Sequence, residues 1–543
     1  MKFHKLKNYL FDIGLVLISA ILLILSFLPV AHLEFLAWFA FLPLFFALKN
    51  KKPFYGFLLS NLCGIFTFSG VIYWLINVTF VGLIFLVLYL ALYFGIFGLI
   101  ITRYSILDTR YSIFVIPSIW VALEYIRSQL FTGFGWALLG YSQYLNLPII
   151  QIVNITGIWG VSFLVMMINV LIYSVIGYRL SVIGKKKIIL TSILGISCIL
   201  VTLIYGHYKL HRAPSTEHRT PIKISVVQPN IPQSIKWQEY AKQDIWEQYL
   251  SLTQEALEDN PDLIIWPESA LPGVLKKDPY IERDLKAFVS NIQIPLLVGV
   301  VNSEKDNYYN SAILISKKGE FIQRYDKLHL VPFGEYIPLK RIFGFLETIV
   351  PIGDFIPGKE YTIFDLGDSS IRLPVSLSAR QTVRPIDQQT GRLKFSVLIC
   401  FEDIFPRISR QFVKKGADFL INITNDAWFG NTSSPYQHLS ASVFRAIENS
   451  VYLIRAANTG ISGFITPTGR VYPLIDNDSG RQTFISGYKA REVYISHKQN
   501  TFYTQWGDWF VLVCGLIVIF GIVKVKGKMK PRHMEQGEHK SDG

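Results

Sequence analysis

The sequence predicts a helical membrane domain joined to one layered α/β domain, and two observations carry this prediction. The chain has 543 residues, of which 51% are hydrophobic and only 17% are charged, whereas soluble domains carry about 25% charged residues. Long apolar runs gather at 1–220 and 501–543, while short strand-like and helix-like segments alternate over 221–500. We therefore expect a membrane domain at 1–220, an α/β domain at 221–500, and a last span with a charged tail at 501–543.

Eight apolar runs are predicted to span a membrane, because most of them approach the ~20 residues that a helix needs to cross a bilayer. The second and the fifth run are shorter than this. The first run has no small-x-small cleavage site, so we expect it to stay as an anchor. The runs cover Leu10–Val30, Phe35–Leu48, Phe54–Val78, Phe80–Ile101, Ile113–Tyr125, Val161–Tyr178, Ile188–Tyr205 and Phe510–Val525.

Charge in the loops predicts the orientation of these spans. Basic clusters follow the second and sixth runs, at Lys49–Lys52 and Arg179–Lys187, whereas Ala31–Glu34 and Asn77–Thr79 hold no Lys or Arg. Because cytoplasmic loops carry the excess of Lys and Arg, we expect both termini in the cytoplasm. The α/β domain then lies on the periplasmic side of the inner membrane. The formal net charge of +14 gathers in these loops, so it does not indicate a nucleic-acid partner.

Two charged residues stand at the edge of the fifth run. Glu124 and Arg127 are three residues apart and therefore share one face of a helix. They either neutralise each other near the membrane interface or belong to a functional site, which is the default hypothesis for charge inside a membrane. The aromatic and Gly-rich stretch Leu130–Gln143 follows them, and we expect it to be interfacial or re-entrant.

The α/β domain is predicted from short apolar runs, which favour strands, and from apolar residues at helical spacing. The predicted strands are Ile222–Gln228, Leu263–Trp266, Leu296–Val301, Ser311–Ser316, Val397–Phe401, Phe419–Thr424 and Gly463–Thr466. The predicted helices are Trp237–Leu257, Ile281–Ile292, Ile404–Lys415 and Gln437–Ala456. Such alternation over this length is typical of one layered α/β domain.

Cys400 is the one cysteine outside the long apolar runs, which hold Cys63, Cys198 and Cys514. The four cysteines therefore indicate neither a disulfide framework nor a metal cluster. Cys400 ends a predicted strand and precedes Glu402 and a predicted helix. Free backbone N–H groups at such a place can lower a thiol pKa. The alternative is that Cys400 is only a small buried hydrophobic residue.

Two further stretches place one charged side chain beside an apolar strand. Leu263–Pro272 delivers Glu268 between two prolines, and Tyr325–Glu335 contains Lys327. Each charge, taken alone, is more often a surface residue. Together with Cys400 they suit covalent catalysis: a thiol nucleophile must lose its proton, Glu268 can accept it, and Lys327 can stabilise an oxyanion.

Glu268, Lys327 and Cys400, in this order, resemble the Glu–Lys–Cys triad of the nitrilase superfamily. The chain further resembles the bacterial apolipoprotein N-acyltransferases, because apolar spans flank the domain. Their motifs are also present, as Trp-Pro-Glu-Ser, Val-Pro-Phe-Gly-Glu and Asn-Asp-Ala-Trp-Phe-Gly. The resemblance covers nearly the whole chain. It implies an α-β-β-α sandwich for 221–500, in which these three residues are catalytic.

The resemblance also implies roles for five further residues. Glu335 and Glu402 match positions of supporting acids near the nucleophile. Trp237, Phe401 and Trp428 match positions that contact the substrate. For the two tryptophans the alternative is plain core packing.

The chain departs from the family pattern in two places. Arg372–Arg392 resembles a polar, Arg-rich insertion, which we expect to be a surface excursion. The alternative for this segment is an arginine patch that holds donor phosphates. Phe401 stands where the family often has Tyr. His329, inside the second motif, is expected to be structural.

The resemblance implies a two-step acyl transfer without a metal or organic cofactor. Cys400 would take an acyl chain from a membrane phospholipid, typically phosphatidylethanolamine. The thioester would then acylate the α-amino group of a diacylglyceryl-cysteine on an apolipoprotein. Both substrates are anchored in the lipid bilayer, which fits the membrane spans. Two alternatives stay open, a membrane-tethered amidase of the same superfamily and a non-catalytic lipid or lipoprotein carrier.

Overall fold

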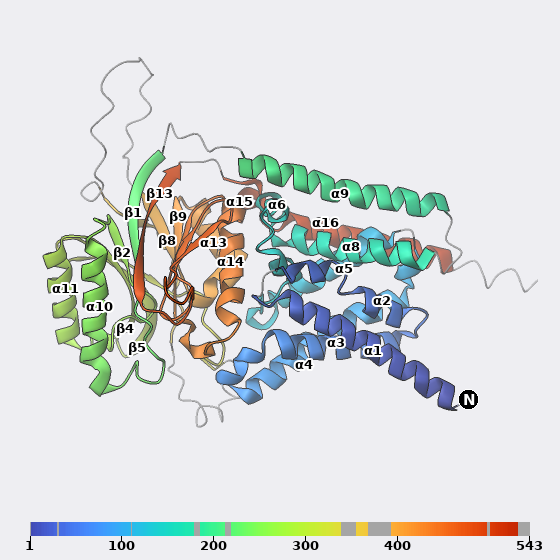
Figure 1. The fold of residues 1–543 in the computed structure, drawn as a ribbon, viewed down its shortest axis with the longest axis horizontal. Helices are drawn as coiled ribbons and strands as arrows, with labels where there is room; N and C mark the ends of the chain where they lie inside the picture. Colours follow the sequence, from blue (N-terminus) through green and yellow to red (C-terminus); the bar gives the residue numbers. More distant parts are fainter. Residues whose placement is uncertain are drawn as a thin grey trace, which may run out of the picture. The chain divides into compact units, whose positions relative to one another are not determined.

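The computed structural model describes residues 2–29, 32–109, 111–178, 185–211, 219–337, 355–367, 393–496 and 500–529. The chain divides into two compact units, which can be followed in Figure 1. One is a helical unit formed by Met1–His211 and Asp508–Gly543, and the other is an α/β unit formed by Arg212–Gly507. The predicted insertion Arg372–Arg392 lies outside the described residues.

Five helices of the helical unit are long and apolar enough to cross a membrane, counted over the described residues. They lie within α1 (Lys2–Ser26), α3 (Pro53–Val71), α4 (Phe80–Arg103), α8 (Ile158–Tyr178) and α9 (Lys185–His211). Local sequence explains where two of them begin. Pro53 occupies the first turn of α3, where a missing N–H costs nothing. The Thr79 hydroxyl accepts a hydrogen bond from Gly82 N at 3.2 Å and caps α4.

The other three predicted spans are helical but shorter. Their apolar stretches lie in η1 and α2 (Glu34–Trp38 and Leu42–Leu48), in α5 (Ser112–Arg127), and in α16 (Trp509–Met529), of which Trp509–Lys524 is the apolar part. The predicted total of eight spans is therefore not confirmed. Short helices complete this unit: η2 (Tyr73–Asn77), η3 (Ile106–Asp108), η4 (Leu130–Thr132), η5 (Leu139–Gln143), α6 (Leu147–Ile150) and α7 (Val153–Thr156).

Glu124 and Arg127 hold the loop that follows α5. Both side chains are buried, with 3% of each exposed. Glu124 Oε1 accepts a hydrogen bond from Leu139 N at 2.6 Å, while Arg127 donates to the carbonyls of Trp136 and Ala137 at 2.9 and 3.3 Å. The charges thus satisfy backbone groups of a segment whose regular structure is limited to the short helices η4 and η5. Leu130–Gln143 itself contains no helix long enough to span a membrane, and its interfacial or re-entrant position stays a prediction.

Two β-sheets form the centre of the α/β unit. The first contains β1 (Arg219–Gln228), β2 (Leu263–Ile265), β3 (Val274–Leu275), β4 (Leu296–Glu304), β5 (Asn307–Ile315), β6 (Phe321–Asp326) and β13 (Gly487–Ser496). The second contains β7 (Phe364–Asp365), β8 (Lys394–Ile399), β9 (Phe419–Thr424), β10 (Leu453–Ala457), β11 (Gly463–Ile465) and β12 (Val471–Pro473). Among the described residues the strand orders are β13-β1-β2-β4-β5-β6, with β3 beside β4, and β12-β11-β10-β9-β8-β7.

Parallel neighbours in both sheets require crossover connections, which the helices supply. In the first sheet β1, β2 and β4 are parallel, and in the second β8, β9 and β10 are parallel. The connecting helices are α10 (Lys242–Leu257), α11 (Pro279–Ile292), α13 (Pro406–Lys414) and α14 (Ser434–Asn449). Figure 1 shows α10 and α11 outside the first sheet and α13 and α14 outside the second. The unit is therefore an α-β-β-α sandwich.

The topology brings the ends of several strands to common edges. β5 is antiparallel to both β4 and β6, so β6 runs in the same direction as β2 and β4. The segments after β2 and β6 therefore leave the first sheet at the same edge. The segments after β8, β9 and β10 likewise leave the second sheet together. Ligands in α/β sheets bind outside such carboxyl ends.

Several predicted element boundaries are wrong, including the following three. The helix predicted from Trp237 begins only at Lys242, after the short η6 (Glu239–Ala241). The helix predicted to reach Ala456 ends at Asn449, because Ser450 adopts a left-handed conformation with φ +55° and β10 follows. The strand predicted to reach Phe401 ends before Cys400, whose backbone is also left-handed.

Candidate active site

Glu268 follows β2 and is almost enclosed, with 7% of the residue exposed. Its Oε1 accepts a hydrogen bond from Asn310 Nδ2 at 2.7 Å, and its Oε2 accepts one from Asn425 N at 2.9 Å. The segment lies directly against β4, where a Cβ on Gly299 would stand only 2.6 Å from Glu268 Cα. Glycine at that position therefore permits the close approach. Two donors, one in β5 and one directly after β9, fix the carboxylate in one orientation.

Lys327 follows β6 and is buried, with 1% exposed. Its Nζ lies 2.9 Å from the carboxylate of Glu335 and 3.6 Å from Glu268 Oε1. Burial alone would lower the pKa of Lys327, but the charges of Glu335 and Glu268 outweigh burial and raise it well above its usual range. The side chain is therefore a permanent cation between two carboxylates.

Cys400 sits at a sharp corner between β8 and the short helix η8 (Cys400–Ile404), with φ +51°. A left-handed conformation costs a residue other than glycine ~1–2 kcal/mol. The carbonyl oxygen of Cys400 accepts hydrogen bonds from Asn422 Nδ2 at 3.1 Å and His438 Nε2 at 3.2 Å. These bonds hold the strained corner that presents the thiol.

The environment of Cys400 differs from the expectation that a helix N-terminus lowers its pKa. Cys400 is only partly buried as a residue. Nevertheless, burial raises the pKa of the thiol well above its usual range, and the charge of Glu268 raises it further, while Lys327 acts in the opposite direction. The resting group is a thiol at neutral pH, so the expectation of a depressed pKa is wrong. A base beside it is needed to form the thiolate.

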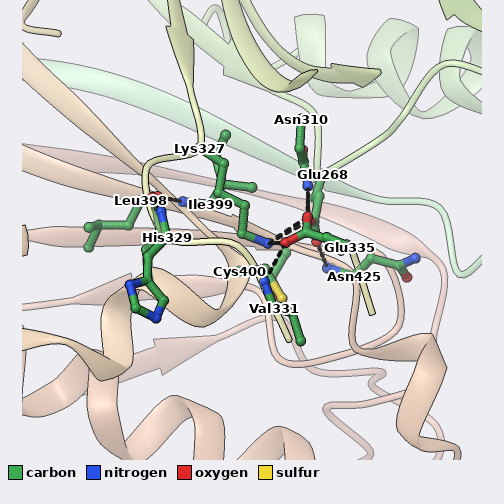
Figure 2. A network of polar contacts seen from close by, with 12 residues as sticks. Glu268, Asn310, Lys327, His329, Val331, Glu335, Leu398, Ile399, Cys400 and Asn425 are labelled. Atoms are coloured by element: carbon green, nitrogen blue, oxygen red, sulfur yellow. Dashed lines mark hydrogen bonds and ion pairs between the residues drawn. The ribbon is translucent and has the colours of Figure 1, made fainter. Parts of the chain in front are cut away.

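The structure brings Glu268, Lys327 and Cys400 together from three separate segments (Figure 2). The figure shows the Lys327 amino group directed at the carboxylates of Glu268 and Glu335, with Cys400 beside them. A thiol, a carboxylate and a fixed cation in one place can perform nucleophilic attack, proton transfer and oxyanion stabilisation. In the described part of the chain, no group of His, Cys, Asp and Glu side chains is arranged to hold a metal ion.

Glu335, one of the two predicted supporting acids, lies in this cluster. It accepts hydrogen bonds from Lys327 Nζ, from Asn310 Nδ2 at 2.7 Å and from Val331 N at 2.8 Å. Asn310 therefore donates to Glu268 and Glu335 at once. Asn310 and Lys327 thus bridge the two carboxylates, and the single charge of Lys327 offsets part of their combined negative charge.

Glu402, the other predicted acid, is fully buried and acts on the backbone. It accepts hydrogen bonds from the Tyr325 hydroxyl at 2.8 Å, Leu328 N at 2.7 Å, His329 N at 3.1 Å and Ile399 N at 2.8 Å. Burial raises its pKa to about 7, while these donors act in the opposite direction. Glu402 thus ties the segment after Lys327 to the strand before Cys400.

The predicted substrate-contacting aromatics differ in exposure. Trp237 is 45% exposed and Trp428 is 51% exposed, so plain core packing does not describe either one. Phe401 is buried and packs on Phe405, with ring centroids 5.1 Å apart. The ring of His329 lies 3.9 Å from that of Phe405, consistent with a structural role.

Several residues at the site were not named from the sequence. Asn310 and Asn425 orient Glu268, and the buried Lys236 donates to the carbonyl oxygen of Glu268 at 3.2 Å. Lys236 stands directly before Trp237, and Asn425 opens the Asn-Asp-Ala-Trp-Phe-Gly motif. Their positions next to a predicted residue and inside a family motif were the only features of the sequence that could have indicated them.

A buried ionic cluster behind Cys400 was also not predicted from the sequence. His438 contacts Asp426 Oδ1 at 2.8 Å and Asp403 Oδ1 at 3.0 Å, and Arg455 contacts the same two acids at 3.1 and 3.2 Å. Burial and Arg455 would lower the pKa of His438, but Asp403 and Asp426 outweigh them and raise it to about 9. The imidazolium therefore donates from both nitrogens, and one of them supports the Cys400 corner.

Comparison with known proteins assigns both units. The family model described as the apolipoprotein N-acyltransferase N-terminal domain matches residues 19–171, and the carbon-nitrogen hydrolase model matches residues 223–485. The fold and these matches define a membrane protein that carries a carbon-nitrogen hydrolase domain. Two relatives that match along almost the whole chain narrow this class to one family.

An apolipoprotein N-acyltransferase from Geobacter metallireducens is 37% identical over 93% of each chain. One from Chlorobaculum tepidum is 29% identical and covers 95% of this chain and 96% of its own. This chain belongs to the apolipoprotein N-acyltransferase family. Among solved structures, a variant of the amidase from Nesterenkonia sp. AN1 is 17% identical, with a TM-score of 0.36 over 54% of this chain and 98% of that chain.

Proposed function

We propose that the chain moves an acyl chain from a membrane phospholipid, through a thioester on Cys400, to the α-amino group of a diacylglyceryl-cysteine on an apolipoprotein. The observation that carries this proposal is the cluster of Glu268, Lys327 and Cys400, in which the two charged side chains are buried. It occurs in a chain that also has the N-terminal domain of the family and five helices suited to a bilayer.

The first half-reaction uses each member of the cluster. Glu268 takes the thiol proton, and Cys400 Sγ attacks the ester carbonyl of the phospholipid. Lys327 stabilises the oxyanion of the tetrahedral intermediate. Glu268 then gives its proton to the departing alcohol, so lysophospholipid leaves and the thioester remains. The carboxylate is regenerated for the second half-reaction.

In the second half-reaction the acyl group passes from Cys400 to the amine of the acceptor. The amine nitrogen attacks the thioester, Glu268 takes one of its protons, and the C–S bond breaks. That proton returns to Sγ, and an amide is released. Water must be kept from the thioester until the acceptor arrives, and an apolar site that admits lipid-anchored molecules excludes it.

The donor and the side of the membrane are further parts of the proposal. The donor is proposed to be phosphatidylethanolamine, and the α/β unit is proposed to lie on the periplasmic side, with both termini in the cytoplasm. The alternation of basic and uncharged loops supports this orientation. Labelling of single cysteines at exposed positions of the α/β unit with an impermeant reagent in intact cells tests it. Labelling only after lysis would contradict it.

Intact-mass measurement tests the acyl-enzyme directly. Protein incubated with phosphatidylethanolamine of one defined acyl composition should gain the mass of one acyl group, and hydroxylamine should remove it. Cys400→Ala should gain nothing. Phosphatidylglycerol with the same acyl chains tests the donor headgroup. No adduct with any phospholipid would contradict the proposal and favour the carrier hypothesis.

A further inference from the structure

A second buried lysine lies at the candidate active site. Only 3% of Lys236 is exposed, and its Nζ donates to the backbone carbonyl of Glu268 at 3.2 Å. Its charge interacts with the Glu268 carboxylate and with Cys400. The two proposed half-reactions do not use this side chain, although it contacts the backbone of the proposed base.

The loop that carries Lys236 is built into the sandwich. Asn458 accepts a hydrogen bond from Ile231 N at 2.8 Å and donates one to Ile231 O at 2.7 Å. Further along the loop, Asn425 Nδ2 donates to Gln233 Oε1 at 2.9 Å. Asn425 also donates through its backbone to Glu268. Lys236 and Glu268 are therefore held by one hydrogen-bonded frame.

The surroundings of the two lysines shift their pKa values in opposite directions. Lys327 has two carboxylates close to its Nζ and stays charged. Burial lowers the pKa of Lys236 to about 8, while Glu268 and Cys400, the titratable groups that act on it, oppose the decrease. Roughly a tenth of Lys236 is then uncharged at pH 7, against roughly three in ten thousand for an ordinary lysine. Lys236 can accept a proton, and Lys327 cannot.

In the proposed second half-reaction, one proton of the acceptor has no base assigned to it. An α-amino group has a pKa of about 7.7–8.0, so most acceptor molecules arrive as ammonium ions at neutral pH. Forming the amide removes two protons from such an ion. Glu268 carries one of them back to Sγ, and a second base must take the other before the nitrogen can attack.

We propose that Lys236 is the base that takes the first proton from the acceptor ammonium group, a role that rests on the proposed function. The uncharged amine of Lys236 accepts this proton, and the free acceptor amine attacks the Cys400 thioester. Glu268 transfers the remaining proton to Sγ as the C–S bond breaks. Lys236 then releases its proton to solvent when the amide leaves. Repulsion between two ammonium groups in one buried site favours the uncharged form of Lys236 when the acceptor ion enters.

A competing role for Lys236 is purely structural. Its hydrogen bond supports the peptide between Glu268 and Ser269, and Ser269 has a left-handed backbone with φ +50°. A residue that only holds this corner would serve both half-reactions equally. A residue that acts only through its charge could be replaced by arginine. The proposed base can be replaced by neither arginine nor a neutral side chain.

The test isolates the second half-reaction in the full-length enzyme. Wild type, Lys236→Arg, Lys236→Met and the surface control Lys242→Met are acylated with phosphatidylethanolamine and freed of excess lipid. The thioester is then discharged with a diacylglyceryl-cysteinyl peptide or with hydroxylamine. Hydroxylamine is uncharged at neutral pH and needs no first deprotonation. Discharge is followed by intact mass from pH 6.5 to 9.5.

Both Lys236 variants should discharge to the peptide up to about 10-fold more slowly than wild type at pH 7, because roughly a tenth of the acceptor amine is already uncharged there. Their discharge by hydroxylamine should stay within about threefold of wild type, because that nucleophile needs no base at the first step. The defect toward the peptide should shrink as pH rises above the pKa of the acceptor amine. Lys242→Met should match wild type.

Other outcomes would overturn the proposal. Full activity in Lys236→Arg would assign a charge role, and equal losses with both nucleophiles would assign a structural one. Unchanged discharge in both variants would remove Lys236 from the reaction. A wild-type thioester that water discharges, and the peptide does not, would overturn the proposed function and the role of Lys236 with it.

Discussion

The ammonium group of Lys327 lies 2.9 Å from the carboxylate of Glu335 and stands farther, at 3.6 Å, from the proposed base Glu268. This pairing leaves Glu268 bound chiefly by neutral amide donors. The Glu335→Gln variant should therefore let Lys327 move to Glu268 and weaken the base. We expect turnover to fall about 10- to 100-fold, measured as amide formation, with the exposed Glu320→Gln as control. Turnover equal to wild type in Glu335→Gln would show that the reaction does not depend on the ion pair between Lys327 and Glu335.

The Glu268→Gln variant should lose about 100- to 10,000-fold in turnover, because the Cys400 thiol then has no base. Its residual rate should rise with pH, since hydroxide can form the thiolate without Glu268 and the pKa of the thiol is raised. Lys327→Ala should be equally inactive without this pH rescue. A Glu268→Gln enzyme that keeps more than about a tenth of wild-type activity would exclude Glu268 as the base.

The His438 cluster predicts a fall in stability at alkaline pH. Because the pKa of His438 is raised to about 9 from 6.5, its contribution is complete below about pH 6.5 and is lost as pH rises through about 9. The loss is on the order of 3 kcal/mol at most. Thermal unfolding in detergent from pH 6 to 10 should show it for wild type, and His438→Gln should flatten the profile. Parallel profiles for the two proteins would contradict the ionic assignment.

The Arg127→Met variant should loosen the loop after α5. It loses hydrogen bonds to two carbonyls and leaves Glu124 buried without its neighbouring cation. Each hydrogen bond from a charged donor contributes ~1.5–3 kcal/mol, so the unfolding temperature in detergent should drop clearly. Arg103→Met, at the exposed end of α4, is the control. Equal unfolding temperatures for both variants would mean that the loop does not depend on Arg127.

The sequence predicted the parts of the fold that depend on local pattern. The strand Phe419–Thr424 was predicted with the bounds observed for β9, because six consecutive residues suit a buried parallel strand. The predicted helix Gln437–Ala456 ran too far, because Ser450 carries no Gly or Pro signal for the left-handed turn that ends it. Helix length in the membrane unit could not be predicted from apolar runs alone, since turns such as η2 interrupt them.

The residues of the candidate site also fall into those that local sequence predicts and those that only the folded structure reveals. Glu268, Lys327 and Cys400 stand in recognisable motifs, so the sequence named them. Asn310 and His438 contact the site only because strands and helices distant in sequence converge on it. A lysine such as Lys236 reads as a surface residue until its burial is known. The residues that were missed are recognised only by their tertiary contacts, which no local pattern encodes.

The most direct test of the account measures lysophospholipid released per enzyme molecule in the absence of an acceptor. If the thioester is protected from water until an amine arrives, each enzyme molecule should release one molecule of lysophospholipid, and release should then stop. Adding a diacylglyceryl-cysteinyl peptide should restart release and form an amide that resists hydroxylamine. Continuous release of lysophospholipid and free fatty acid without the peptide would contradict the account, because water would then be the acceptor and the enzyme a hydrolase.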